Sequence, residues 1–236
     1  MSAPLLVEPE FEDVGIVLIG DFNPAIFNPD WLLQNDLVGA DAAKRSVIDI
    51  IHPDVAQFRV GDIELIVQRN RFQILTRVAP FVAVLDFVSK TFGESLPHTP
   101  VRQSGINHSV HFKVKNQKIR TAIGRILAST HPWGQWGEDI EKSSAEFQGG
   151  MASLSMQEVR SSSSFMRRIT ATVQPSTTVA NQSGIYVSIN DHNEPESKDK
   201  TSMSVLDALI SRFDSSLLDS KRIINTVMLL KDKAHV

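Results

Sequence analysis

Apolar and polar positions in the first hundred residues alternate in a way that predicts strands between helices. A β-branched, apolar run at 15–22 predicts a buried strand. Three shorter runs follow, in which apolar residues recur at every second position, as in a strand with one buried face. They span 56–60, 63–68 and 72–78, and the turn sequence Gly61-Asp62 joins the first two into a hairpin.

Helices are predicted on either side of these three strands. The sequence Asn28-Pro29-Asp30 suits the start of a helix, which is expected to run to residue 37. A further helical segment is expected at 40–51. Apolar residues recur at helical spacing again from Pro80 to Gly93, which predicts a third helix.

The second half of the chain repeats this order of elements. The elements expected there are a strand at 105–112, a helix at 116–128, a glycine-rich loop at 131–150, and strands at 151–160, 166–174 and 184–190. A polar linker is expected at 191–200. Apolar residues then keep helical spacing to residue 228, which predicts a long last helix that is bent or split near Ser215.

These patterns predict an α+β protein made of two diverged β-α-β-β-β-α repeats, residues 1–96 and 101–236. Gly15 and Gly105 each stand seven residues before a phenylalanine. Neither repeat buries its sheet easily alone, so we expect the two to share one curved antiparallel sheet with helices on one face. This arrangement is similar to the saddle of the TATA-box-binding protein. One compact unit is expected, in which the second repeat carries the long C-terminal helix.

Composition narrows the functional classes. The chain has 236 residues, of which 42% are hydrophobic, and it contains no cysteine. Disulfides, thiolate metal sites and a cysteine nucleophile are therefore excluded, and a reducing, cytoplasmic location is expected. The acidic N-terminus does not resemble a signal peptide, and no apolar run approaches the roughly 20 residues of a membrane helix. No motif indicates a cofactor or a metal.

Charge is distributed unevenly. Residues 1–64 contain twelve acidic and three basic residues, a balance of −9, and since the whole chain is −3 the remainder sums to +6. The segment 101–125 contains six basic residues and no acidic one. Such asymmetry fits an anionic partner or the attraction of one half for the other half of a neighbouring copy. Two solvated faces that balance each other explain it equally simply.

Three residues of this basic segment, Lys115, Lys118 and Arg125, are candidates for a binding surface, because they would partly share one polar helical face. Nucleic-acid binding would use such a stripe, but it usually requires a basic domain. The sequence pI of about 6.2 makes this the minor interpretation.

Histidines and an aspartate are the candidate catalytic residues. His108 and His111 lie three apart on a predicted strand, so they should point to opposite faces and cannot share a metal. Asp191 and His192 end a strand, where functional side chains often lie. Neighbours on an extended chain diverge, however, and asparagine and aspartate also cap turns. These four residues are weak candidates for a hydrolase or nuclease site between the repeats.

The expected loop at 131–150 contains two indoles, Trp133 and Trp136. If they are exposed, they form a recognition patch, because aromatic anchors dominate binding interfaces. If they are buried, they cover the end of the sheet.

Several segments together resemble a sporadically distributed family of bacterial proteins whose function is not established. They are the segments 22–31, 105–108, 127–133, 174–177 and 189–192. The patchy occurrence of that family resembles accessory cargo, such as phage-defence or toxin-immunity loci. The absence of strong catalytic motifs favours a non-enzymatic binding or assembly protein, with a protein partner or a second copy as its ligand. An enzyme and a nucleic-acid or nucleotide sensor are the alternatives.

Overall fold

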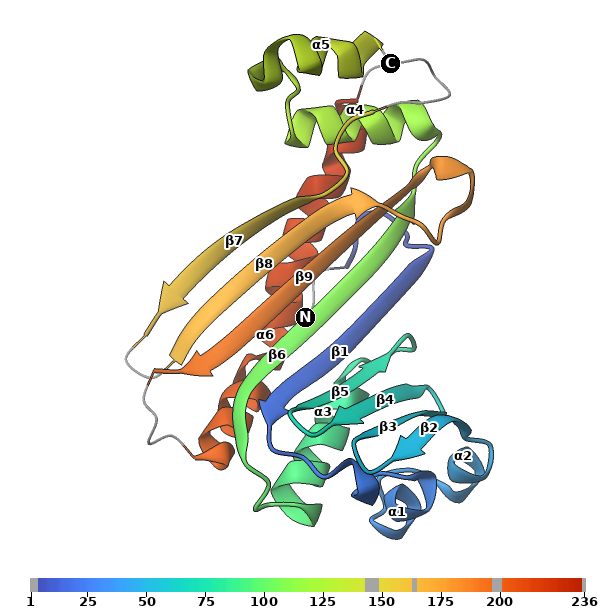
Figure 1. Ribbon diagram of the computed structural model, residues 1–236, viewed down its shortest axis with the longest axis vertical. Helices are drawn as coiled ribbons and strands as arrows, with labels where there is room; N and C mark the ends of the chain where they lie inside the picture. Colours follow the sequence, from blue (N-terminus) through green and yellow to red (C-terminus); the bar gives the residue numbers. More distant parts are fainter. Residues whose placement is uncertain (1–3, 143–148, 163–164, 197–200, 235–236) are drawn as a thin grey trace.

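The computed structural model describes residues 4–142, 149–162, 165–196 and 201–234. Nine strands within these residues form one open, antiparallel sheet in the order β2-β3-β4-β5-β1-β6-β9-β8-β7 (Figure 1). The strands are β1 Phe11–Gly20, β2 Val47–His52, β3 Val55–Val60, β4 Ile63–Gln68, β5 Arg71–Thr76, β6 Val101–Lys113, β7 Leu154–Ser161, β8 Phe165–Pro175 and β9 Gly184–Pro195. The chain is therefore an α+β protein with a single large sheet, as the sequence predicts.

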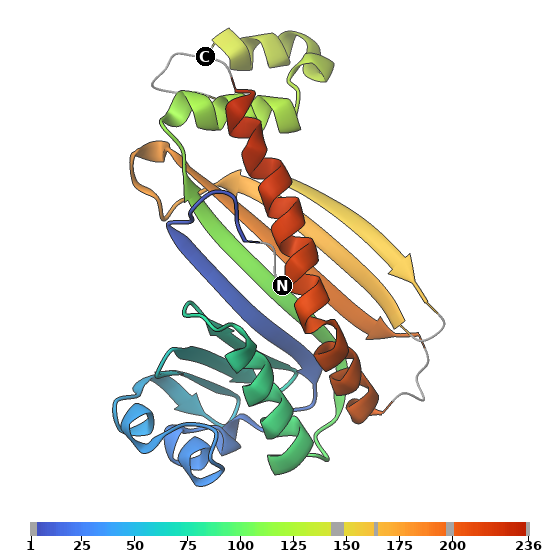
Figure 2. The ribbon, with the colours of Figure 1, turned by 180° about the vertical axis from the view of Figure 1, so that it is seen from behind.

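Helices cover one face of this sheet and its two ends. They are α1 Pro29–Gln34, α2 Ala40–Lys44, α3 Val82–Lys90, α4 Gln117–Leu127, α5 Gly134–Lys142 and α6 Ser202–Met228. Helices α3 and α6 lie across the same face (Figure 2), whereas α4 and α5 lie at the end of the molecule opposite α1 and α2. Within the described residues, the other face of the sheet is uncovered over its central strands (Figure 1). No helix of the described chain is long and apolar enough to cross a membrane.

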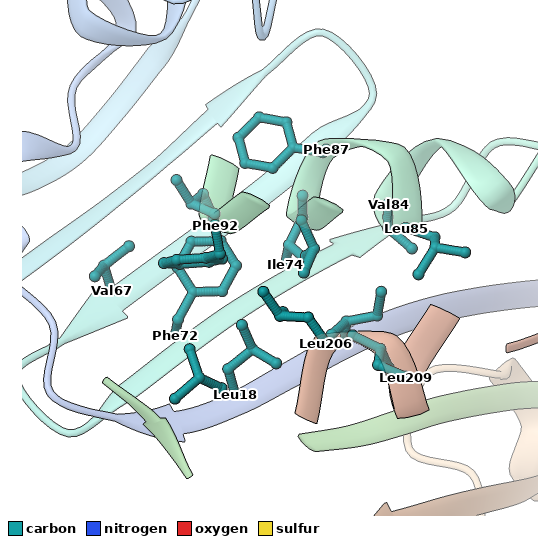
Figure 3. Close-up of a cluster of buried hydrophobic side chains, with 14 of the residues drawn as sticks. Leu18, Val67, Phe72, Ile74, Val84, Leu85, Phe87, Phe92, Leu206 and Leu209 are labelled. Carbon is teal, nitrogen blue, oxygen red and sulfur yellow. The ribbon is translucent and has the colours of Figure 1, made fainter. Parts of the chain in front are cut away.

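The larger of two apolar clusters lies between strands β1, β3, β4 and β5, helix α3 and the N-terminal half of α6. Figure 3 shows Leu18 and Phe72 from the sheet packed beside Leu206 and Leu209 from α6. Leu18, Phe72 and Leu209 are fully buried. Burying a side chain of this size contributes about 1.5–3 kcal/mol. The first half of the chain therefore shares its core with the last helix.

The second cluster lies between β6, β8, β9, the C-terminal half of α6 and α4. Strand β6 shows how the sequence selects the buried face, because Val110 and Phe112 of this cluster and Ile106 of the first cluster are all buried on the side of α6. Residues at the intervening positions point to the uncovered face. A shift of one residue in register would exchange the two sets of side chains, so the apolar alternation specifies the pairing strongly.

Two predicted elements are wrong because the local residue types favoured a different secondary structure from the one observed. The expected helix at 40–51 ends at Lys44, and 47–52 is strand β2, whose β-branched residues suit an extended chain. The expected loop at 131–150 contains helix α5, which the pair Glu138 and Lys142 supports at helical spacing. The glycine and tryptophan residues in this segment favoured a loop. Gly134 does lie in the turn that leads into the helix, where its φ of 55° suits glycine.

Boundaries near the C-terminus also differ from the prediction. Strand β9 continues to Pro195, so residues 191–195 of the expected linker belong to a strand, and residues 197–200 of that linker lie outside the described chain. Helix α6 is continuous through Ser215. Serine hydroxyls in α6 donate hydrogen bonds to backbone carbonyls of the preceding turn, as Ser220 does to Ser216. These bonds satisfy the hydroxyls, so the helix can continue through its serine residues.

Candidate functional site

The uncovered face of the central strands is lined by hydroxyl and amide side chains. It includes Asn107, Ser109, Thr170, Thr172, Tyr186, Ser188 and Asn190. Strand register explains the set, since each residue alternates with a core residue facing α6. Asn190 donates a hydrogen bond to Asn107 at the centre, across the β6–β9 pair. The result is a polar surface formed by several strands.

A polar cluster with shifted pKa values lies where β1, β6 and β9 meet on this face. Ser109 pairs with Asp13 across the β1–β6 ladder, and its Oγ lies 3.2 Å from both the Tyr186 hydroxyl and the Ser188 Oγ. Burial raises the pKa of the Asp13 carboxyl. The charges of Arg77, His111 and His108 and a hydrogen bond from Ser109 oppose this rise without cancelling it.

His111 belongs to the same cluster. Its ring packs on Tyr186, with centroids 4.7 Å apart, and against Phe11. Burial lowers the pKa of His111, and the charge of Asp13 partly offsets this. The His111 Nδ1 lies 2.8 Å from Ser176 Oγ. Because that oxygen accepts two backbone N–H groups, Ser176 donates its own proton to a neutral His111.

This Ser176–His111 pair does not have the geometry of a nucleophile and its base. Ser176 is buried, and its oxygen accepts from the amides of Thr178 and Val179, which makes it the anchor of a turn. Four concave regions of the described chain are lined by other residues, so none of them opens on Asp13, His111 or Tyr186.

His108 lies on the opposite face of β6 from His111, as the spacing predicts. It is buried under the helical layer, and its Nε2 lies 2.8 Å from a carboxylate oxygen of Glu12. The two histidines thus have separate environments and do not form one site.

Asp191 and His192 also point in opposite directions. Asp191 is buried and accepts two hydrogen bonds from Arg167, at 2.8 and 2.6 Å, while Asp219 of α6 lies 3.2 Å from the same guanidinium. His192 lies on the uncovered face, where burial lowers its pKa and the charge of Glu194 opposes the shift. Asp191 is therefore placed to hold β8 and β9 to α6, and it does not orient His192.

Trp133 and Trp136 lie together at the end of the molecule. Trp133 ends a short turn before α5 and Trp136 belongs to α5; their rings form an edge-to-face pair 5.2 Å apart. Their exposed fractions are 62% and 60%. Of the two interpretations of these indoles, the structure supports an exposed patch.

The basic candidates lie in α4 and just before it, and Lys118 and Arg125 are seven residues apart, which is about two turns of that helix. Lys115 precedes α4, Lys118 is exposed in its first turn, and Arg125 is half-buried, with an Nε that has no hydrogen-bond partner among the described residues. Sequence reasoning did not single out two other residues that the structure makes prominent. The first is Asp13, whose pKa is raised by burial beside the neighbouring strand β6. The second is Arg167, whose guanidinium contacts Asp219 of α6.

Among the described residues, no three histidine, aspartate or glutamate side chains are grouped so that they could hold a metal ion.

Comparison with models of protein families and with curated proteins found no match to this chain.

Proposed function

We propose that this protein is a non-enzymatic binding and assembly protein, and that its principal interaction is strand pairing at the β2 edge with a second copy. The exposed apolar edge of β2 carries the proposal. Val47, Ile48, Ile50 and Ile51 are all between 43% and 52% exposed, and the strand is paired only with β3 in the described chain. Exposed, apolar edges of this kind pair readily with other strands.

The other edge strand of the sheet, β7, differs from β2 in carrying more charged residues, and this difference supports β2 as the pairing edge. Strand β7 carries Glu158 and Arg160, which form an ion pair with each other at 2.6 Å. Charged side chains protect an edge against unwanted pairing. Strand β2 has a single charge, Asp49, beside a register irregularity.

Local charge is compatible with self-association. Although residues 1–64 are strongly acidic, the segment 41–69 around β2 contains five acidic and four basic residues, a balance of −1. Two copies could therefore approach through this edge without strong repulsion, and the partner's β-branched side chains would cover the exposed ones.

Introducing a charge into β2 tests this assignment. We expect Ile50→Lys to abolish association, because it places an unpaired ammonium in an apolar strand pair. Val159→Lys on β7 is the matched control, since Val159 is also an exposed, β-branched edge residue, at 54%. Sedimentation velocity over a range of concentrations should show a dimer for the unmodified chain and Val159→Lys, and a monomer for Ile50→Lys. A chain that stays monomeric at hundreds of micromolar would contradict the proposal.

The duplicated, saddle-like architecture is part of the same proposal. Reading outward from the centre, the strand order is β1-β5-β4-β3-β2 on one side and β6-β9-β8-β7 on the other. Helices α3 and α6 each follow the last strand of their half and lie on the same face. A pseudo-twofold relation between two diverged repeats accounts for both regularities.

We further propose membership of the bacterial family that the sequence resembles, and a role as an accessory component of a phage-defence or toxin-immunity locus in the cytoplasm. The segments 22–31 and 105–108 carry that resemblance. Neighbouring genes test it: recurrent proximity to nuclease, toxin or defence genes would support the role, and proximity to metabolic genes would refute it.

An enzyme remains the second candidate, favoured by the shifted pKa values of Asp13 and His111 where the two halves meet. A hydrolase and nuclease screen tests it. Turnover that His111→Ala removes would promote this candidate over the binding function. Binding to nucleic acid through Lys115 and Lys118 would instead weaken steeply with salt.

A further inference from the structure

A cavity of about 310 Å³ lies beneath α4, beside the second apolar cluster. Ile123 of α4, Val173 of β8 and Ile185 of β9 form its apolar walls, and Met151 closes one side. Pockets that bind small molecules begin at about this volume and combine apolar walls with a few polar groups. The cavity is separate from both the β2 edge and the polar cluster around His111.

Arg120 is the charged residue that lines this cavity. It lies one helical turn before Ile123 and Gly124, which also line the cavity, so it belongs to the inward stripe of α4. In the described chain, no carboxylate pairs with its guanidinium. Burial lowers the pKa of Arg120. Arg120 is half-buried, so its guanidinium loses part of its hydration, and a carboxylate bound in the cavity would compensate for that loss.

We propose that this cavity binds a small amphiphilic carboxylate, whose apolar body lies against Ile123 and Val173 and whose carboxylate accepts hydrogen bonds from Arg120. The planar guanidinium offers two parallel N–H groups, which match the two oxygens of a carboxylate. The volume accommodates a ligand with roughly eight to twelve heavy atoms, at about 30 Å³ per water-sized group. A medium-chain fatty acid or an aryl-alkanoic acid has this chemistry.

Isothermal titration calorimetry with octanoate tests the proposal on the full chain, with 1-octanol as the neutral probe of similar length. We expect octanoate to bind and octanol to bind at least tenfold more weakly, because only the acid uses the guanidinium. Arg120→Met should weaken octanoate about tenfold or more. Lys118→Met is the matched control: it removes an exposed charge from the same helix, and binding should stay within about twofold of the unmodified chain.

Methyl NMR on the unmodified protein keeps the test independent of any substitution that perturbs folding. Octanoate should shift the methyl resonance of Met151, which lines the cavity, and leave that of Met203, exposed on α6, unchanged. No binding heat at millimolar octanoate would overturn the proposal. Equal binding of acid and alcohol, or equal loss in Arg120→Met and Lys118→Met, would overturn it as well. These results test only the cavity. Association through β2 is tested separately by sedimentation velocity, so failure of one proposal can be distinguished from failure of the other.

Discussion

At the scale of single residues, the uncovered face combines a carboxyl and an imidazole whose pKa values are both shifted toward the neutral form. Asp13 is partly buried where β1 meets β6, and His111 is packed between Phe11 and Tyr186. Burial moves the two pKa values in opposite directions, upward for the acid and downward for the base. Both shifts favour the neutral form of the group.

The raised pKa of Asp13 makes a prediction about stability. An acid whose pKa is higher in the folded state contributes stability below its unfolded pKa, and loses that contribution as the pH rises through the folded value. We therefore expect Asp13→Asn to raise the melting temperature at pH 7, with the gain disappearing below about pH 3.8. The asparagine oxygen can still accept the hydrogen bond from Ser109.

Asp214→Asn is the control for this substitution, because Asp214 is exposed on α6. Thermal unfolding followed by circular dichroism from pH 3 to pH 8 measures both variants. If Asp13→Asn lowered the melting temperature at pH 7, ionised Asp13 would be a stabilising group, contrary to this account.

At the scale of elements, a buried ion network attaches the sheet to its longest helix. Arg167 of β8 binds Asp191 of β9 and Asp219 of α6, and both Arg167 and Asp191 are nearly inaccessible to solvent. Such a network makes little net contribution compared with apolar packing, yet removing one partner is costly because the other charge stays buried.

We expect Asp191→Ala to lower the free energy of unfolding by about 3–5 kcal/mol, since it leaves the Arg167 guanidinium with only the longer contact to Asp219. The double substitution Arg167→Met with Asp191→Leu should cost markedly less than Asp191→Ala alone. Urea denaturation measures both. Glu158→Ala breaks an exposed pair with Arg160 and serves as the control, with an expected change within about 1 kcal/mol. A negligible effect of Asp191→Ala would show that Arg167 is solvated.

At the scale of the whole molecule, the two halves of the chain share one core and one sheet. Leu206, Leu209 and Phe213 of α6 complete the cluster that also contains Leu18 and Phe72. Strand β1 pairs with β6 along most of its length. The acidic first half is thus bound to the second half by packing as well as by charge, for example through the pair Asp21 and Arg102.

A fragment of residues 1–100 should therefore not fold by itself. It lacks the α6 side chains that bury Leu18 and Phe72, and it leaves β1 as a new edge. We expect weak near-ultraviolet circular dichroism, binding of a hydrophobic dye and no cooperative unfolding transition. The full chain provides the comparison. Cooperative unfolding of the fragment would mean that the first half is an independent domain.

The sequence by itself determined much of the strand content and which face each residue of a strand occupies. Alternation identified β3, β4, β5 and most of β6, and a period of two separated His108 from His111 and Asp191 from His192. These properties are local, since they depend on steric preferences of neighbouring residues and on the geometry of an extended chain.

Only the tertiary structure decided which residues and elements contact one another. Val47 to His52 became a strand because β3 was available to pair with it, and Asp191 became part of a buried ion network because Arg167 lies beside it. The cavity at Arg120 exists only where α4 packs over β8 and β9. Arg167 and Asp191 lie 24 residues apart, and α4 is separated from β8 and β9 by a similar or greater length of chain. No local pattern specifies these contacts, and only the folded sheet brings the partners together.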